Sequence, residues 1–317
     1  MKNGLKFLAV TSLFMDSVGQ HIVDTQNQQL HLKELCAQKQ IYSDAKRYFY
    51  LQLIIAVPIP ILIAVSQLFI DRDNHTFNWI FALYGVTASI AEIVIENYIT
   101  KLKRIAATIQ EQFDTAVLLI AWNNVLIKER EMPEIIHKYY AKHLKISDNI
   151  DRLYNWYSLK IRSIHSNAAT LICQRTNCTY DFSIRQKFIF IIGAIGIITL
   201  ITIVIAANAI GINVPIFFTN IALPILPVTL IIIKQYNLNA ESIQNLVDLK
   251  ELIEQELHDL NSETNVSPNI IRQIQDKIFT NRTNSPLMPN QLYDRLWGKL
   301  ENEMNFAVET IISELDS

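Results

Sequence analysis

The chain has 317 residues, of which 50% are hydrophobic and 18% charged, and its formal net charge is −2 at neutral pH. Its 7 glycines leave little material for glycine-rich phosphate loops, and neither G-x-G-x-x-G nor GK[ST] occurs. The concentration of apolar residues in long runs favours a membrane protein over two soluble domains.

Four apolar runs dominate the sequence: Tyr50–Ile70, Trp79–Ile95, Phe188–Ile210 and Val214–Ile233. A hydrocarbon core about 30 Å thick requires roughly 20 helical residues to cross it, and each run is near that length. Buried helices of a large soluble core would not need runs this long and this free of charge. We therefore expect an all-α membrane protein with four transmembrane helices in two hairpins.

Basic residues flank the same ends of all four runs, and the positive-inside rule makes that side cytoplasmic. These flanking residues are Lys46, Arg47, Lys101, Lys103, Arg104, Arg185, Lys187 and Lys234. Both termini are then cytoplasmic. The expected organisation is an N-terminal arm (1–49), a first hairpin (50–99), a helical middle segment (100–187), a second hairpin (188–233) and a helical tail (234–317).

The N-terminal stretch MKNGLKFLAVTSLFM resembles a weak signal peptide, with two lysines before a short apolar run. We expect it to remain uncleaved, because cleavage would imply an exported N-terminus against the charge flanks. Translation from Met15 is the alternative, in which case residues 1–14 would not belong to the native protein.

The two large hydrophilic segments differ in charge. Residues 100–187 hold fourteen Lys or Arg against eight Asp or Glu, whereas residues 234–317 hold seven against fourteen. Three interpretations stay open. The basic residues contact lipid headgroups beside a solvated acidic tail, the two segments dock by charge, or the basic segment receives an anionic ligand.

The tail predicts three helices from apolar residues that recur at three- and four-residue steps. These stripes run over Ile243–Leu260, Ile270–Ile278 and Leu292–Met304. The polar stretch NSETNVSPN and the proline-flanked TNSPLMPN separate them. Such stripes are typical of core or oligomer contacts.

Several residues inside or beside the apolar runs are candidates for lining a pore or pairing helices. Glu92 and Glu96 lie one helical turn apart, and intramembrane acids are functional candidates because burying their charge in lipid is costly. Glu96 is close enough to the membrane edge to extend to the interface instead. Pro58 and Pro60 can kink the first run, as can Pro215, Pro224 and Pro227 in the fourth. Gly193 and Gly196 allow close helix contact in the third run.

No catalytic constellation is readable in the sequence, so we expect no enzyme, no cofactor and no DNA or RNA partner. The stretch CQRTNC contains Cys173 and Cys178, but a zinc site needs four ligands and no second pair follows. A stable disulfide is disfavoured in the cytoplasm. The pattern favours packing of two small thiols, with Arg175 and Asn177 offering hydrogen bonds between them.

Five stretches carry a resemblance to a known family: AQKQIYSDAKR, IQEQFDTAVLLIAWN, LYNWYS, ICQRTNCTYDFSIRQKF and IRQIQDKIFTNRTNSPLMPNQLYDRL. With the four apolar runs they resemble the S-4TM family, the SMODS-associated four-transmembrane effectors. The resemblance extends from about residue 25 to about residue 305. The Cys–Gln–Arg–x–Asn–Cys block and the tail motif are its most specific parts.

This resemblance implies a pore-forming effector of a bacterial antiphage system, placed in the inner membrane and activated by a cyclic oligonucleotide. A homo-oligomer is expected, because four helices cannot enclose a wide pore. The alternative is a non-conducting membrane receptor or scaffold that recruits a soluble partner. The motif positions taken over as candidate sensing or coupling residues are Asp114, Cys173, Arg175, Asn177, Cys178, Arg272 and Arg282.

Overall fold

The computed structural model describes residues 17–66, 75–146, 150–210, 223–260 and 265–315. Every regular element among these residues is helical, which confirms the all-α prediction for this part of the chain. The α-helices are α2 (Val18–Thr25), α3 (Gln29–Ala56), α4 (Pro58–Ser66), α5 (His75–Val117), α6 (Pro133–Ile146), α7 (Ala168–Ile210), α9 (Leu223–His258), α10 (Pro268–Asn284) and α11 (Asn290–Leu315). Two short 3-10 helices, η1 (Asp151–Leu153) and η2 (Leu159–Ser163), lie between α6 and α7.

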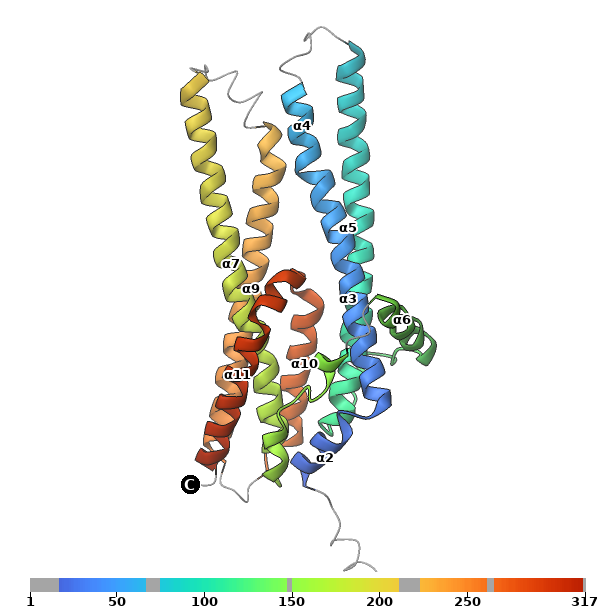
Figure 1. Cartoon of the computed structure of the whole chain (residues 1–317), viewed down its shortest axis with the longest axis vertical. Coiled ribbons are helices and arrows are strands. Elements are labelled where there is room, and N and C mark those ends of the chain that lie inside the picture. Colours follow the sequence, from blue (N-terminus) through green and yellow to red (C-terminus); the bar gives the residue numbers. More distant parts are fainter. Residues whose placement is uncertain (1–16, 67–74, 147–149, 211–222, 261–264, 316–317) are drawn as a thin grey trace, which may run out of the picture.

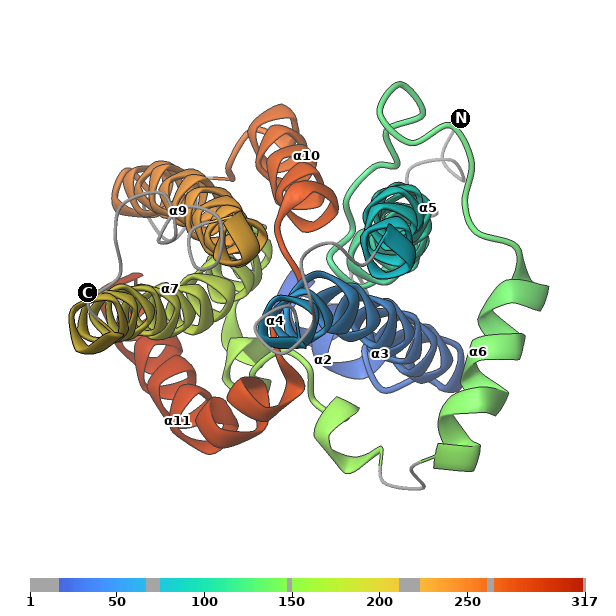
Figure 2. The same cartoon turned by 90° about the horizontal axis from the view of Figure 1, so that it is seen from above.

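The molecule is elongated, and its longest helices run along the long axis (Figure 1). Helix α3 packs beside α5, and α7 packs beside α9, so the chain forms two long antiparallel pairs, with α4 following α3 and contacting α9. Helices α2, α6, α10 and α11 surround one half of these pairs and leave the other half bare (Figures 1 and 2). The bare half contains the predicted hairpin segments.

The long helices pass without interruption through the predicted segment boundaries. Helix α5 continues across residues 99 and 100, α7 across 187 and 188, and α9 across 233 and 234. The first run is different, because α3 ends at Ala56 and α4 begins at Pro58. Proline has no N–H to donate and suits the first turn of a helix, so Pro58 explains this break.

The core lies in the half that carries the additional helices. The first two tail stripes predicted from periodicity face inward there, which confirms them as core contacts, whereas the third (Leu292–Met304) is only partly buried apart from Leu300. The buried members of the first two are Leu246, Leu249, Ile253, Leu257, Ile271, Ile274 and Ile278, and they pack with Phe113, Tyr157, Leu171 and Ile172. A second cluster joins α3 to α5 and α6 through Ala37, Ile41, Leu102 and Ile136.

Helix α2 is part of this core, although the family resemblance begins only near residue 25. Ile22 is fully buried, and Gly19 donates its amide to the carbonyl of Ile164 over 3.0 Å. A Cβ built on Gly19 would lie 1.8 Å from the carbonyl oxygen of Ile161. Only glycine therefore permits this close approach of α2 to η2.

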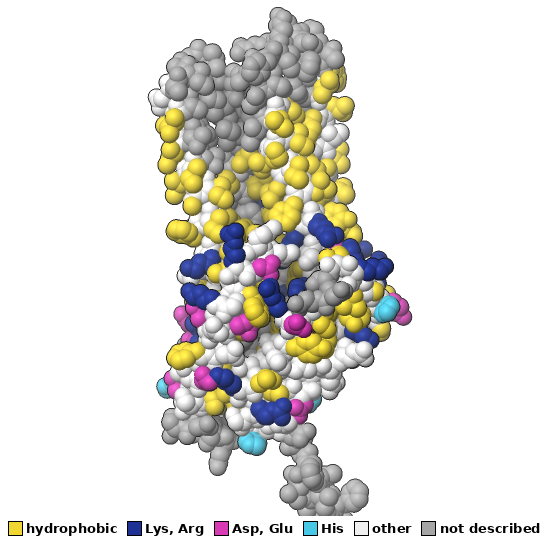
Figure 3. Space-filling model, in the orientation of Figure 1, with side chains coloured by type: hydrophobic (Ala, Val, Ile, Leu, Met, Phe, Trp, Pro, Cys, Tyr) yellow, Lys and Arg dark blue, Asp and Glu magenta, His cyan; other side chains and the backbone are white. Residues whose placement is uncertain are grey.

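The bare half presents large apolar side chains outward, as Figure 3 shows. Trp79 is 76% exposed, Leu83 63%, Phe190 78% and Ile205 63%. Within the described ranges, however, no helix meets the length and hydropathy expected of a bilayer-spanning segment. Residues 67–70 and 214–222, with Pro215, belong to the predicted runs but lie outside the described residues.

Candidate functional site

Two buried carboxylates near the end of α5 form the centre of the candidate site. Glu111 and Asp114 are each 0% exposed. Helix α10 supplies a guanidinium to each of them. Arg272 donates to Glu111 over 2.6 Å, and Arg282 donates to Asp114 over 2.5 Å. The two ion pairs fasten α10 across the end of α5.

Gln275, also on α10, bridges the two ion pairs. Its Nε2 donates to Glu111 Oε2 over 2.8 Å and to Asp114 Oδ2 over 3.1 Å. Its Oε1 accepts from Gln174 of α7 over 3.1 Å, and Gln174 also donates to the carbonyl of Ile271. Because Gln275 lies on α10 and these bonds reach both α5 and α7, the three helices meet at this glutamine.

Tyr157 provides a second link from Asp114 to α7. Its hydroxyl donates to Asp114 Oδ1 over 2.7 Å and accepts from Asn177 Nδ2 over 3.0 Å. Burial, followed by the charge of Asp114, raises the pKa of the tyrosine well above its usual value. The hydroxyl thus keeps its proton and stays a donor to Asp114. We call Glu111, Asp114, Tyr157, Gln174, Asn177, Arg272, Gln275 and Arg282 the buried network.

Burial dominates the electrostatics of Glu111. It raises the pKa of the carboxyl to about 7, with Arg272 opposing the shift and Asp114 adding to it. Taking charges out of water costs several kcal/mol per ion, which paired charges recover only with good geometry and further hydrogen bonds. Glu111 therefore gains or loses its proton near neutral pH.

The structure brings four predicted candidates into this network, namely Asp114, Asn177, Arg272 and Arg282, but it places Arg175 elsewhere. Arg175 turns outward and donates to Glu254 of α9 over 2.9 Å through Nε. Its side chain is 16% exposed and that of Glu254 is 43% exposed. Asn177, two residues further on, is thus the residue of this block that reaches Tyr157 and the carboxylates of α5.

Cys173 and Cys178 are free thiols within the main core cluster. Burial raises the pKa of Cys173 well above its usual value and that of Cys178 to about 12. Both sulfurs stay protonated at neutral pH, whereas metal binding and nucleophilic attack require the thiolate. Among the described residues, no group of three or more His, Cys, Asp or Glu is placed to hold a metal ion.

The candidates in the bare half are separated from the buried network. Glu92 is exposed on α5, whereas Glu96 accepts from Gln52 of α3 over 3.1 Å and lies 3.8 Å from Lys234 of α9. Glu96 thereby connects the two helical pairs. Gly196 lies against Ile232 of α9, where an added Cβ would be 3.5 Å from Cγ2.

The other three candidates of the bare half make fewer contacts. An added Cβ on Gly193 would meet nothing within 4 Å among the described residues. Pro60 is partly buried in α4, and Pro58 is exposed at the start of that helix. Helix α4, which contains both prolines, contacts α9 of the other helical pair.

The middle segment and the tail do dock through charges, in two ways. On the surface, basic residues of the middle segment meet acids of the tail, as in Arg152–Asp294 at 2.8 Å and Lys160–Glu309. In the interior the signs are reversed, since the acids belong to α5 and the guanidiniums to α10. The net charges of the two segments could predict only the ion pairs on the surface.

Four network members were not selected from the sequence: Glu111, Tyr157, Gln174 and Gln275. All four lie inside the stretches that carry the family resemblance. Their common signal is a polar side chain among apolar residues at core positions of a helix or of a short aromatic motif. A buried polar residue usually needs a partner, so this pattern would have found them.

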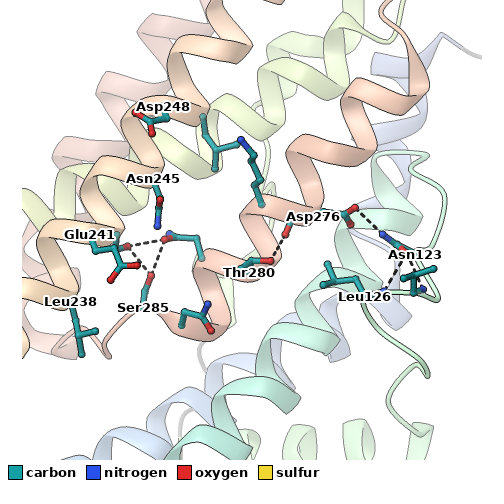
Figure 4. A pocket seen from close by; sticks show the side chains of 15 residues that line it. Asn123, Leu126, Leu238, Glu241, Asn245, Asp248, Asp276, Thr280 and Ser285 are labelled. Atoms are coloured by element: carbon teal, nitrogen blue, oxygen red, sulfur yellow. Dashed lines mark hydrogen bonds between the residues drawn. The ribbon is translucent and has the colours of Figure 1, made fainter.

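A cleft of about 500 Å³ lies between α9 and α10, next to the segment after α5 (Figure 4). Its charged lining is acidic, with Glu241, Asp248 and Asp276 against Lys277. Asp276 accepts from Asn123 over 2.8 Å at one end, and Ser242 donates to Asn281 over 3.0 Å at the floor. This lining disfavours a ligand that carries several phosphates.

The fold and the buried network define an all-helical protein in which two long helical pairs and a C-terminal tail are coupled through buried charges. The chain belongs to the SMODS-associating 4TM effector family, whose domain model matches residues 20–311. A protein of Bacillus cereus strain VD146, described as a "probable CBASS effector molecule", is 25% identical to it over 279 residues. That match covers 86% of this chain and 92% of the relative. No solved structure matches the chain significantly.

Proposed function

We propose that this protein is a pore-forming effector of a bacterial antiphage system, which opens the inner membrane when a cyclic oligonucleotide signals infection. The family and the description of the Bacillus cereus relative support the effector role. The observation that carries the membrane part is the exposed apolar half, with its aromatic and basic borders.

The apolar half has the dimensions of a bilayer. Trp79, at one end of α5, is 76% exposed, and Tyr98 further along the same helix is 42% exposed. At about 1.5 Å per residue, these two aromatic residues are roughly 28 Å apart along the axis, close to the hydrocarbon thickness of a membrane. The large apolar side chains between them include Ile80, Leu83, Val86, Ile90, Ile93 and Val94, each more than half exposed.

The inner border combines aromatic and basic side chains, as interfacial belts do. Tyr48 packs edge-on against Tyr98, with ring centroids 4.8 Å apart, so α3 and α5 reach this border together. Tyr50 and Tyr236 are also exposed. The exposed basic residues on the same four helices are Arg47, Lys101, Arg104, Lys187 and Lys234. Soluble proteins rarely expose an apolar surface of this size, which supports membrane insertion. The basic residues at this border support an orientation with both termini cytoplasmic.

The buried network is a suitable element for a switch. It joins both helical pairs to α10 through hydrogen bonds and ion pairs, so a shift of α10 would break several of them together. A messenger opens such a protein only if it binds the open arrangement more tightly than the closed one. The acidic cleft does not support a direct phosphate contact, so the cyclic-oligonucleotide part of the proposal is supported by the family alone.

A homo-oligomer is part of this proposal. One chain offers only two helical pairs, and the exposed apolar face of α7 with Gly193 provides a surface for a second copy.

The decisive measurement is membrane potential in bacteria that express this protein together with a nucleotidyltransferase that makes cyclic oligonucleotides. We expect the potential to collapse before growth stops, and only when both proteins are present. Cells expressing the nucleotidyltransferase alone are the control. A potential that persists while growth stops would refute pore formation.

A non-conducting scaffold remains the second candidate, favoured by α11, where Phe306 is 71% exposed on an acidic helix. Removing residues 290–317 separates the two functions while keeping α10 and its ion pairs. A scaffold loses its effect on growth, whereas a pore keeps its conductance.

A further inference from the structure

Three cationic side chains converge where the long helices leave the apolar half. They are Lys103 of α5, Arg185 of α7 and Lys234 of α9. Lys103 is only 9% exposed and Arg185 only 5%. Glu96 lies seven residues before Lys103, so both occupy one face of α5, and Glu96 is 3.8 Å from Lys234 of α9. The charges of Glu96, Arg185 and Lys234 all act on Lys103. Figure 3 shows Lys and Arg side chains gathered at this border.

Arg185 is fully engaged in this cluster. It donates to Asp181 over 3.0 Å, to Asn239 over 3.0 Å and to the carbonyl of Pro286 over 3.1 Å. Its charge is therefore balanced by a carboxylate on its own helix. Glu96 is shared between Gln52 and Lys234, so it offers at most one carboxylate to two lysines.

Lys103 is the cation that lacks a partner. Within the part of the chain that the structure describes, its ammonium group makes neither a hydrogen bond nor an ion pair. Burial lowers its pKa to about 8, with Glu96 opposing the shift and Arg185 and Lys234 adding to it. It is therefore still mainly protonated at pH 7, and a cation on a largely buried side chain, with its nearest carboxylate shared with another lysine, attracts an anion.

We propose that Lys103 and Lys234 make the inner mouth of the open protein selective for small inorganic anions such as chloride. This inference rests on the proposed pore, whose ions would pass between the two helical pairs at this level. Rings of basic side chains select anions in pores, because they lower the energy of an entering anion and raise that of a cation. Glu96 alone cannot reverse the sign, since two lysines face it.

The test uses the full-length protein in planar bilayers of phosphatidylcholine, so that no anionic lipid contributes charge. The probes are cyclic di-AMP and cyclic GMP–AMP, and the chloride-to-potassium permeability ratio is measured from reversal potentials in a KCl gradient. We expect wild-type protein to favour chloride. Lys103→Gln should lower the ratio about tenfold, the effect of removing about 1.4 kcal/mol of charge interaction. Lys234→Gln should lower it less, because its side chain is 49% exposed.

Two controls separate charge from folding. Lys101→Gln removes an exposed lysine from the same turn of α5 and should leave the ratio unchanged. Lys103→Arg keeps the charge and should keep the preference, including at pH 9, where the wild type loses part of it. A conducting wild type that favours potassium, or an unchanged ratio in both Gln variants, overturns the inference while leaving the pore intact. Absence of conductance with both probes and in cells contradicts the pore itself, and the inference fails with it.

Discussion

At the scale of single residues, Asp114 depends strongly on its hydrogen-bond partners. It accepts hydrogen bonds from Tyr157, Gln275 and Arg282 while fully buried. Each donor comes from a segment far from α5 in the sequence. The carboxylate consequently holds together parts of the chain that share no local contact.

Removing one member of the Asp114–Arg282 pair should destabilise the protein strongly. We expect Arg282→Gln to lower the free energy of unfolding by about 3–5 kcal/mol, because it leaves a carboxylate buried without its cation. The double variant Asp114→Asn with Arg282→Gln should recover part of this loss. Denaturant unfolding of the detergent-solubilised protein measures both.

A surface pair provides the matched comparison. Arg152 and Asp294 are 44% and 59% exposed, so Arg152→Gln should cost at most about 1 kcal/mol. Equal losses in Arg152→Gln and Arg282→Gln would show that burial does not distinguish the two pairs.

Glu111 predicts a pH dependence of stability. Burial raises its folded-state pKa from 4.5 to about 7, so the folded state binds the proton more tightly than the unfolded state. The stabilisation from this proton is complete below pH 4.5 and is lost as the pH rises through about 7. The stability of wild-type protein relative to Glu111→Gln should therefore fall between pH 4.5 and pH 7.

Unfolding midpoints of wild-type protein and Glu111→Gln, compared across this range, measure the effect. The difference between the two proteins isolates Glu111 from the other titrating groups. A difference that stays constant with pH would contradict the raised pKa.

At the scale of elements, the helices of the tail followed from sequence because their apolar residues repeat with the period of a helix. Helix α10 begins and ends, and α11 begins, near the polar and proline-rich breaks that the sequence shows. The continuity of α5, α7 and α9 through the border of the apolar half could not be read in the same way. Apolar and amphipathic patterns adjoin there, and nothing in either pattern shows whether the backbone breaks between them.

Two glycine substitutions should have opposite effects on stability, because one glycine lies at the contact of α2 with η2 and the other lies in an open part of α11. Gly19→Ala should destabilise the protein by about 1–3 kcal/mol, because the new Cβ would collide with the backbone of Ile161. Gly298→Ala should stabilise it by about 0.5–1 kcal/mol, since Gly298 lies in α11 with nothing within 4 Å of an added Cβ.

Thermal unfolding of both glycine variants beside the wild type checks this prediction. The same chemical change is made in a helix at each position, so intrinsic helix propensity is matched. A stabilised Gly19→Ala would mean that α2 does not pack on η2 as described.

At the scale of the whole molecule, the sequence identified where the important polar residues lie but not how they are paired. Asp114, Asn177, Arg272 and Arg282 were selected as separate motif positions, and the structure joins them. Their partners Tyr157 and Gln275 could not be assigned, because they lie 43 and 161 residues from Asp114 and the pairing depends on how α7 and α10 pack. Arg175 was grouped with Asn177 by proximity, although a helix turns the two side chains to different sides.

Coupling between the two helical pairs should depend on Asn177 and much less on Arg175. We expect Asn177→Ala to change growth arrest in cells that carry the nucleotidyltransferase, because it leaves Tyr157 without a donor in the buried network. Arg175→Ala removes a partly exposed pair with Glu254 and should leave growth arrest within about twofold of wild type.

Growth curves and membrane fractionation together test this pair of variants. Both proteins should insert into the membrane in equal amounts, so a difference in growth reflects coupling. The expectation fails if Arg175→Ala is inactive and Asn177→Ala is fully active.

Helix α5 spans 43 residues without a break, and the buried network contacts it near one end, at Glu111 and Asp114. Such a helix is a lever roughly 65 Å long at about 1.5 Å per residue. From Glu111 to Trp79 the arm is roughly 48 Å, so a tilt of about 5° at the gripped end displaces the far end by about 4 Å. Small adjustments around a few hydrogen bonds can in this way be converted into motion at the far end of the apolar half, with no break along the helix.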